Sequence, residues 1–103
     1  MAQFLFTYTG GSAPTSPEEG AKVMAIWVDW FKGLGTGTID MGNPTGPSKS
    51  VTPGGAVADA PSGPTGYSII GADSLDAAVA IAKTCPVLHA GGTVIVSAVQ
   101  DMM

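Results

Sequence analysis

The sequence of 103 residues lacks arginine, has few charged residues of either sign and contains a single histidine. Its four basic residues are all lysines, and the formal net charge is −4. Binding to nucleic acid needs a clustered basic patch that can neutralise phosphates, and this composition argues against one. Without arginine, the chain also lacks the planar fork that captures phosphate or carboxylate groups in a bidentate manner. We therefore expect no nucleic-acid partner.

Other common signals are also missing from the chain. The single cysteine, Cys85, cannot form an intrachain disulfide, so nothing indicates an oxidising compartment. No stretch reaches the roughly 20 apolar residues of a membrane-spanning helix, and the N-terminal stretch does not resemble a signal peptide. The sequence shows no metal-ligand spacing, nucleophile elbow or phosphate-binding loop. We therefore expect a cytoplasmic protein without membrane contact, cofactor or metal.

The apolar content, at 45%, is that of a folded protein, and the length predicts one domain over residues 1–103. Only 12% of the residues are charged, which is few for keeping a surface in water. Some apolar surface must therefore be covered by something else.

The segment from Gly66 to Val99 gives the strongest local signals, and it reads as strand, helix and strand. The first strand is predicted at 67–70 and the last at 93–99, because both runs are rich in β-branched or aromatic residues. Ser74 is placed as the N-cap of the helix, and Pro86 ends it. Helical spacing places four residues on the face toward the sheet: Leu75, Ala78, Val79 and Ala82.

The N-terminal segment alternates aromatic and other residues, which predicts a strand from Gln3 to Thr9. Phe4, Phe6 and Tyr8 then share one face of that strand. These rings either belong to the core, or Tyr8 places its hydroxyl group in a pocket.

A helix is predicted from Pro17 to about Leu34, with Ser16 as its N-cap. Its apolar stripe is wider than one contact with a sheet requires, and one face carries Val23, Ile26, Trp27, Trp30 and Leu34. The two tryptophans, Trp27 and Trp30, either pack on the sheet as core residues or line the edge of a ligand cavity.

A short second strand is predicted at 38–41, and the chain then leaves the regular pattern. Residues 42–66 contain five prolines and six glycines, which excludes a helix. We interpret this part as a long excursion from the sheet, with short extended pieces at 49–52 and 56–58.

The resulting order is strand, helix, strand, excursion, strand, helix and strand. This pattern predicts an α+β, ferredoxin-like βαββαβ fold, with both helices on one face of a four-stranded antiparallel sheet. In the last strand, Val94 and Val96 point to one face while Ile95 and Val99 point to the other. Since two helices cover only one face, we expect a homodimer that pairs the remaining faces.

Several motifs resemble those of the YCII-related family, which includes the DGPF-domain proteins and has a dimeric α+β barrel architecture. They are the stretches 66–70 and 72–78, the pair Cys85-Pro86 and the stretch 91–94. The resemblance implies a ferredoxin-like protomer, a dimer across the sheet and a cleft beside the sheet. The family's suggested acid-base pair is a histidine in the first helix and an aspartate before the third strand. Here Trp27 stands near the first position, and Asp59, in Asp-Ala-Pro, resembles the second.

Two functions follow from these observations. The first is a dimeric protein that binds a small, largely apolar molecule in a cleft that involves Tyr8, Trp27, Trp30 and Asp40. The second is a small isomerase or lyase that works by proton transfer to and from its substrate, with His89 and Asp59 as the catalytic residues. His89 is the candidate because it is the only side chain whose ordinary pKa lies near neutrality.

Overall fold

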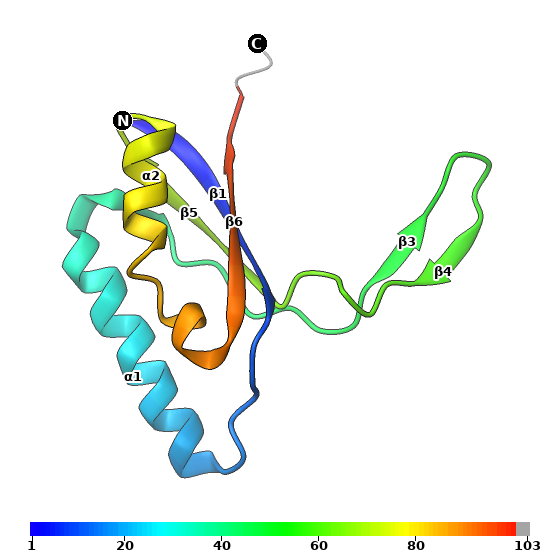
Figure 1. Ribbon diagram of the computed structural model, residues 1–103, viewed down its shortest axis with the longest axis horizontal. Coiled ribbons are helices and arrows are strands. Elements are labelled where there is room, and N and C mark those ends of the chain that lie inside the picture. Colours follow the sequence, from blue (N-terminus) through cyan, green and yellow to red (C-terminus); the bar gives the residue numbers. More distant parts are fainter. Residues whose placement is uncertain (101–103) are drawn as a thin grey trace.

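The structure, a computed structural model, describes residues 1–100 and contains two α-helices and a four-stranded antiparallel sheet (Figure 1). The last three residues of the predicted domain lie outside the described range. The sheet strands are β1 (Ala2–Gly10), β2 (Thr38–Asp40), β5 (Gly66–Ala72) and β6 (Gly92–Ala98). The helices are α1 (Pro17–Leu34) and α2 (Leu75–Ala82), and two 3-10 helices are η1 (Gly35–Gly37) and η2 (Pro86–Ala90).

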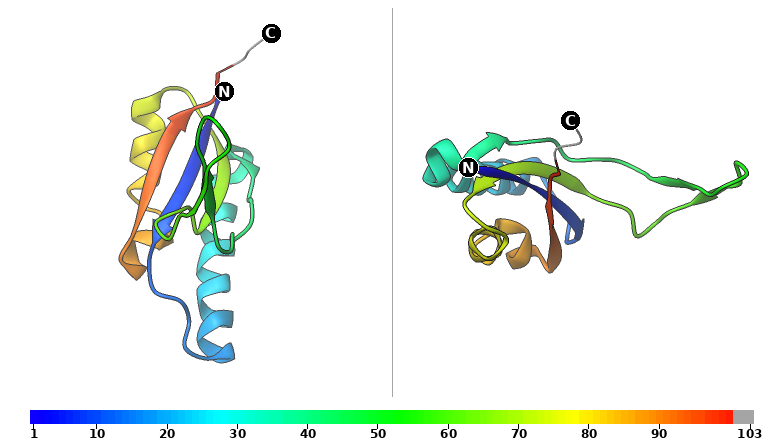
Figure 2. Two further views of the ribbon diagram at one scale, coloured as in Figure 1. Left: turned by 90° about the vertical axis from the view of Figure 1, so that its right-hand side faces the viewer. Right: turned by 90° about the horizontal axis from the view of Figure 1, so that it is seen from above.

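The strand order in the sheet is β2-β5-β1-β6, and each neighbouring pair is antiparallel. Both helices lie on the same face of this sheet (Figures 1 and 2). The α+β prediction is confirmed, and the arrangement is compatible with a ferredoxin-like fold.

The centre of the core is the aromatic face of β1. Phe4, Phe6 and Tyr8 are all buried, as their alternation predicts. Phe6 lies opposite Ser68 of β5 and Val96 of β6, which places it in the middle of the sheet beneath the helices. These rings therefore form the floor on which α1 and α2 pack.

The start of each helix is as predicted, but the faces that pack on the sheet differ from the prediction. In α2, Ala78 and Ala82 are buried, whereas Leu75 and Val79 remain 49% and 39% exposed. The alanines allow α2 to lie close to the sheet. Because they occupy the face in contact with it, Leu75 and Val79 point away from the core.

The predicted face of α1 also has to be corrected. The buried residue of this helix is Phe31, while Ile26 is 55% exposed. Trp27, Trp30 and Leu34 are only partly buried against the core. The stripe is rotated from the predicted one because Phe31 contacts the core most deeply.

The excursion contains a second, two-stranded sheet, formed by β3 (Lys49–Val51) and β4 (Val57–Asp59). We call residues 45–65 the arm. Figures 1 and 2 show it projecting from the body of the molecule. The two extended pieces predicted at 49–52 and 56–58 are confirmed to within one residue at each end.

The sheet face opposite the helices has no covering element in residues 1–100, and we call it the open face. The register pairs Leu5 with Ile69 and Ser97, and Thr7 with Tyr67 and Ile95. These six uncharged side chains are half-buried or exposed, in contrast to the buried aromatic face of β1. Among the described residues, no helix has the length and apolar character needed to cross a membrane.

Candidate functional site

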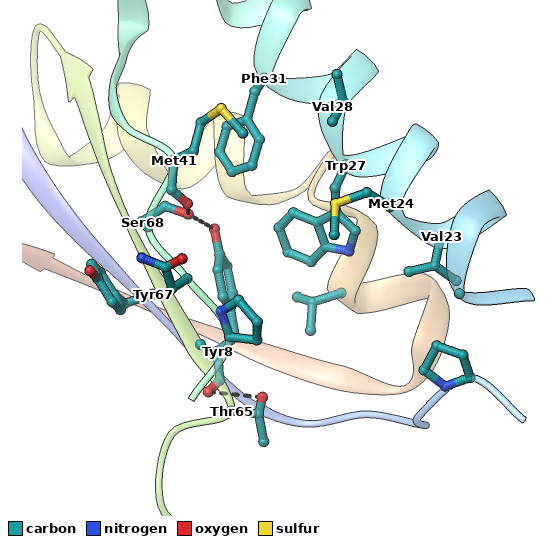
Figure 3. Close-up of a pocket in the computed structure, with 17 residues that line it drawn as sticks. Tyr8, Val23, Met24, Trp27, Val28, Phe31, Met41, Thr65, Tyr67 and Ser68 are labelled. Atoms are coloured by element: carbon teal, nitrogen blue, oxygen red, sulfur yellow. Dashed lines mark hydrogen bonds between the residues drawn. The ribbon is translucent and has the colours of Figure 1, made fainter. Parts of the chain in front are cut away.

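A cleft of about 590 Å3 separates part of α1 from the sheet. Its residues come from five places: the loop before α1, α1 itself, the end of the sheet, the segment 41–44 that follows β2, and η2. Figure 3 shows the labelled side chains around this space. The volume lies within the range of about 300 to 1,000 Å3 that is typical of small-molecule sites.

The lining is largely apolar and contains no acidic or basic side chain among the described residues. The residues of α1 that line the cleft are Gly20, Val23, Met24, Trp27, Val28 and Phe31. They occupy consecutive turns on one side of the helix, because residues three or four apart in a helix share a face. The surplus of apolar residues in α1, which one sheet contact does not require, is thus explained by the cleft.

Tyr8 and Ser68 connect the floor of the cleft to its rim through two hydrogen bonds (Figure 3). The hydroxyl of Tyr8 donates to Oγ of Ser68 at 2.8 Å, and Ser68 donates to the carbonyl oxygen of Met41, also at 2.8 Å. Ser68 is fully buried, so this pairing satisfies a polar group that would otherwise be costly to remove from water. The two bonds link β1, β5 and the chain after β2.

Burial shifts the acid-base behaviour of the groups under the cleft. It raises the pKa of Tyr8 well above its ordinary value, and this effect exceeds the opposing one of the hydrogen bond with Ser68. Burial likewise raises the pKa of the Cys85 thiol. Both groups are therefore neutral near pH 7, and neither supplies a charge for a ligand or for catalysis.

Trp27 forms the helix side of the cleft and meets Tyr8 edge to face, with the ring centroids 5.0 Å apart. Such contacts between aromatic rings are favourable because the positive edge of one ring faces the negative face of the other. The structure thus brings together two of the predicted ligand-binding residues.

Trp30 does not line the cleft, although it was predicted to bind the ligand with Trp27. Its indole N–H donates to Oγ1 of Thr84 at 2.9 Å, and its ring packs between Phe6 and Phe31. The residue therefore joins α1 to the chain that follows α2. Its position supports the alternative of a packing residue.

Asp40 is exposed and lies outside the cleft lining. Its Oδ1 accepts a hydrogen bond from the backbone N–H of Gly42 at 2.8 Å, which closes a turn. Gly42 has a positive φ of 72°, and a Cβ atom there would lie 1.7 Å from the carbonyl oxygen of Tyr67. Asp40 thus shapes the rim of the cleft through a turn in which only glycine fits.

The two proposed catalytic residues lie on different parts of the molecule. Asp59 is in β4 on the arm, where its carboxylate pairs with the ammonium group of Lys49. His89 is exposed in η2, beside the start of β6. Neither residue lines the cleft, and no hydrogen bond or ion pair joins them within residues 1–100.

Sequence reasoning missed the part of the cleft wall that lies outside α1 and β1. It did not predict the roles of Ser68, Met41 or Val87, which line the cleft from β5, the segment after β2 and η2. No local signal identifies Ser68, because its partner in register is Phe6, and its hydrogen bond with Tyr8 forms only once β1 and β5 are paired. Across residues 1–100, no cluster of three or more histidine, cysteine or acidic side chains is placed to hold a metal ion.

Comparison of the chain with known proteins found no matching family, no matching curated protein and no matching solved structure.

Proposed function

We propose that this protein binds a small, uncharged and largely apolar molecule in the cleft between α1 and the sheet. The observation that carries the proposal is the lining, which combines a suitable volume with the absence of acidic and basic side chains from its described residues. A charged ligand would lose its hydration there without gaining an ionic partner, whereas an apolar one would release water from apolar surface.

The orientation of the ligand would come from the few polar groups at the cleft. No hydrogen bond in the described structure uses the indole N–H of Trp27 or the side-chain amide of Asn43, and both residues line the cleft. Both groups are hydrogen-bond donors. We therefore favour ligands that carry a neutral acceptor such as a carbonyl or ether oxygen.

The same proposal includes a homodimer that pairs two copies through the open face, within the YCII-related family. The resemblance described above and the apolar character of the open face support it. Leu5 lies directly opposite Ile69, while Ile95 lies on the other neighbouring strand opposite Thr7, diagonal to Leu5. These three side chains would otherwise present apolar surface to water. The six open-face side chains named above carry no charge, so pairing them with their copies brings no like charges together there, and a twofold axis closes the assembly.

The alternative of a proton-transfer enzyme receives less support. The carboxylate of Asp59 is held by Lys49 on the arm, away from the cleft, and His89 lies outside it. An acid and a base act together only when both reach the same substrate.

The experiment that tests ligand binding uses N-phenyl-1-naphthylamine, an uncharged apolar dye whose fluorescence rises in apolar surroundings. We expect saturable binding by the protein and loss of most of this signal in Met24→Trp, which fills the mouth of the cleft from an exposed position. Ile26→Trp is the matched control, because Ile26 is also exposed on α1 but does not line the cleft.

The result that would contradict the proposal is equal dye binding by the wild-type protein and both variants. Circular dichroism and the melting temperature of each variant establish that the body remains folded. Since Met24 is 60% exposed and Ile26 55% exposed, we expect both substitutions to leave the fold intact.

A further inference from the structure

The arm leaves the body on the same side as the open face. In Figure 1 the helices lie at the left of the sheet and the arm extends to the right. The left view of Figure 2, taken from that right-hand side, shows the arm in front of the sheet with the helices behind it. The open face and the arm therefore form two walls of an inside corner.

The two sides of the arm are joined at its base by backbone hydrogen bonds and by one close approach. Thr45 donates its backbone N–H to the carbonyl oxygen of Thr65, and Ala60 donates to that of Ser48, both at 3.0 Å. A Cβ atom on Gly63 would come within 2.4 Å of Oγ of Ser48, so the two sides of the arm approach closely there. These contacts hold the two sides of the arm together at its base, and the backbone N–H of Thr65 joins that base to the sheet by donating to the carbonyl oxygen of Tyr8 at 2.7 Å.

The end of the arm has no comparable support from its own chain. Every residue from 49 to 59 is exposed, and Val51 and Val57, which face each other across the ladder, are 68% and 64% exposed. An isolated two-stranded hairpin is marginally stable in water and usually needs a further surface to pack on. The arm thus presents an apolar pair with no partner within residues 1–100.

We propose that the arm clasps a second copy of this chain, so that Val51 and Val57 of each copy pack against the body of the other. This inference rests on the homodimer proposed above and adds the arm as a second contact. A copy seated on the open face enters the corner formed by that face and the arm, and the twofold axis makes the second arm act reciprocally.

The charge distribution favours a second copy over a charged partner. The only charged groups between residues 45 and 65 are Lys49 and Asp59, which neutralise each other, and the six side chains named above at the centre of the open face are uncharged. Both walls of the corner therefore suit an equally uncharged surface. The open face of another copy is such a surface.

The first experiment measures the dimer dissociation constant by sedimentation over a series of concentrations. The test variant replaces residues 50–58 by Asn-Gly, which shortens the arm and leaves its base intact. We expect its dissociation constant to be about tenfold higher or more, since burying two valines on each arm is worth at least that factor. Near-ultraviolet circular dichroism of the tryptophans serves to show that the packing of the body is unchanged.

A pair of point variants gives a sharper comparison. Val57→Ser removes one side chain of the apolar pair, while Ala58→Ser makes a similar polar change on the opposite face of the hairpin. We expect Val57→Ser to weaken the dimer more than Ala58→Ser does. Equal effects of the two would contradict the assigned contact.

The possible outcomes separate the two proposals. If the wild-type protein is a dimer and the shortened variant dimerises equally well, the clasp is wrong and the open-face dimer stands. If the wild-type protein is a monomer at every concentration, both are wrong. Hydrogen exchange adds a direct readout, because amide protection at β3 and β4 should rise as the protein concentration passes the dissociation constant.

Discussion

The two helices cover the same sheet face in different ways. Helix α2 contacts the sheet through Ala78 and Ala82, which are buried and small. Helix α1 contacts it through Phe31 and the partly buried Trp27 and Trp30. The cleft lies under α1, and α2 contributes no residue to its lining.

This difference shows how residue size decides where a cavity forms. Interaxial distances between packed elements depend on the side chains at the contact, so alanines allow close approach and aromatic rings do not. Helix α1 is also longer than α2, with 18 residues against 8. Its large side chains rest on the core near one end, which leaves space along the rest of the helix.

The largest effect is expected from Phe31→Ala, which removes the most buried side chain of α1. Losing its contacts and leaving a void should lower the free energy of unfolding by about 3 to 5 kcal/mol. Chemical denaturation measures the change. Ile26→Ala, at an exposed position of the same helix, should alter stability by about 0.5 kcal/mol or less. Similar losses for the two variants would mean that the face of α1 is misassigned.

A smaller loss of stability is expected when a residue of α2 that contacts the sheet is replaced by a larger one. Ala78→Leu should destabilise the protein by about 1 to 3 kcal/mol, because the added atoms must push the helix away from the core. Ala80→Leu makes the same change at an exposed position and should be nearly neutral. Thermal unfolding of both proteins makes the comparison, and a stable Ala78→Leu variant would show that α2 has room to move.

The smallest effect is expected from the helix caps. Oγ of Ser16 accepts the N–H of Glu19, and Oγ of Ser74 accepts the N–H of Ala77, both at 3.1 Å. Ser74→Ala should cost about 1 kcal/mol and lower the melting temperature by about 4 to 8 °C. Ser62→Ala, in the arm, should leave the melting temperature unchanged. An equal decrease in both would count against the cap.

The sequence predicted the elements well wherever local signals agreed. Ser16 and Ser74 are N-caps as expected, and the alternation of Phe4, Phe6 and Tyr8 identified the buried face of β1. Capping and alternation depend on neighbours in the chain, so they can be recognised without knowledge of the fold.

Helix faces and the limits of the site were harder to predict, because they depend on contacts between distant segments. Periodicity placed Leu75 and Val79 toward the sheet, but the closer fit of Ala78 turned them outward. Likewise, Trp27 and Trp30 look equivalent in the sequence. Only Thr84, which lies 54 residues further along the chain, determines that the indole of Trp30 is used for packing.

Cys85 gives this molecule a built-in reporter of its own fluctuations. The side chain is fully buried between the end of α2 and η2, it is the only thiol in the chain, and burial raises its pKa. A thiol-specific reagent reacts with the exposed thiolate, so it can modify Cys85 only during moments when this part of the core opens. The labelling rate of the native protein is therefore a measure of how often the wall behind Tyr8 separates, obtained without introducing any probe.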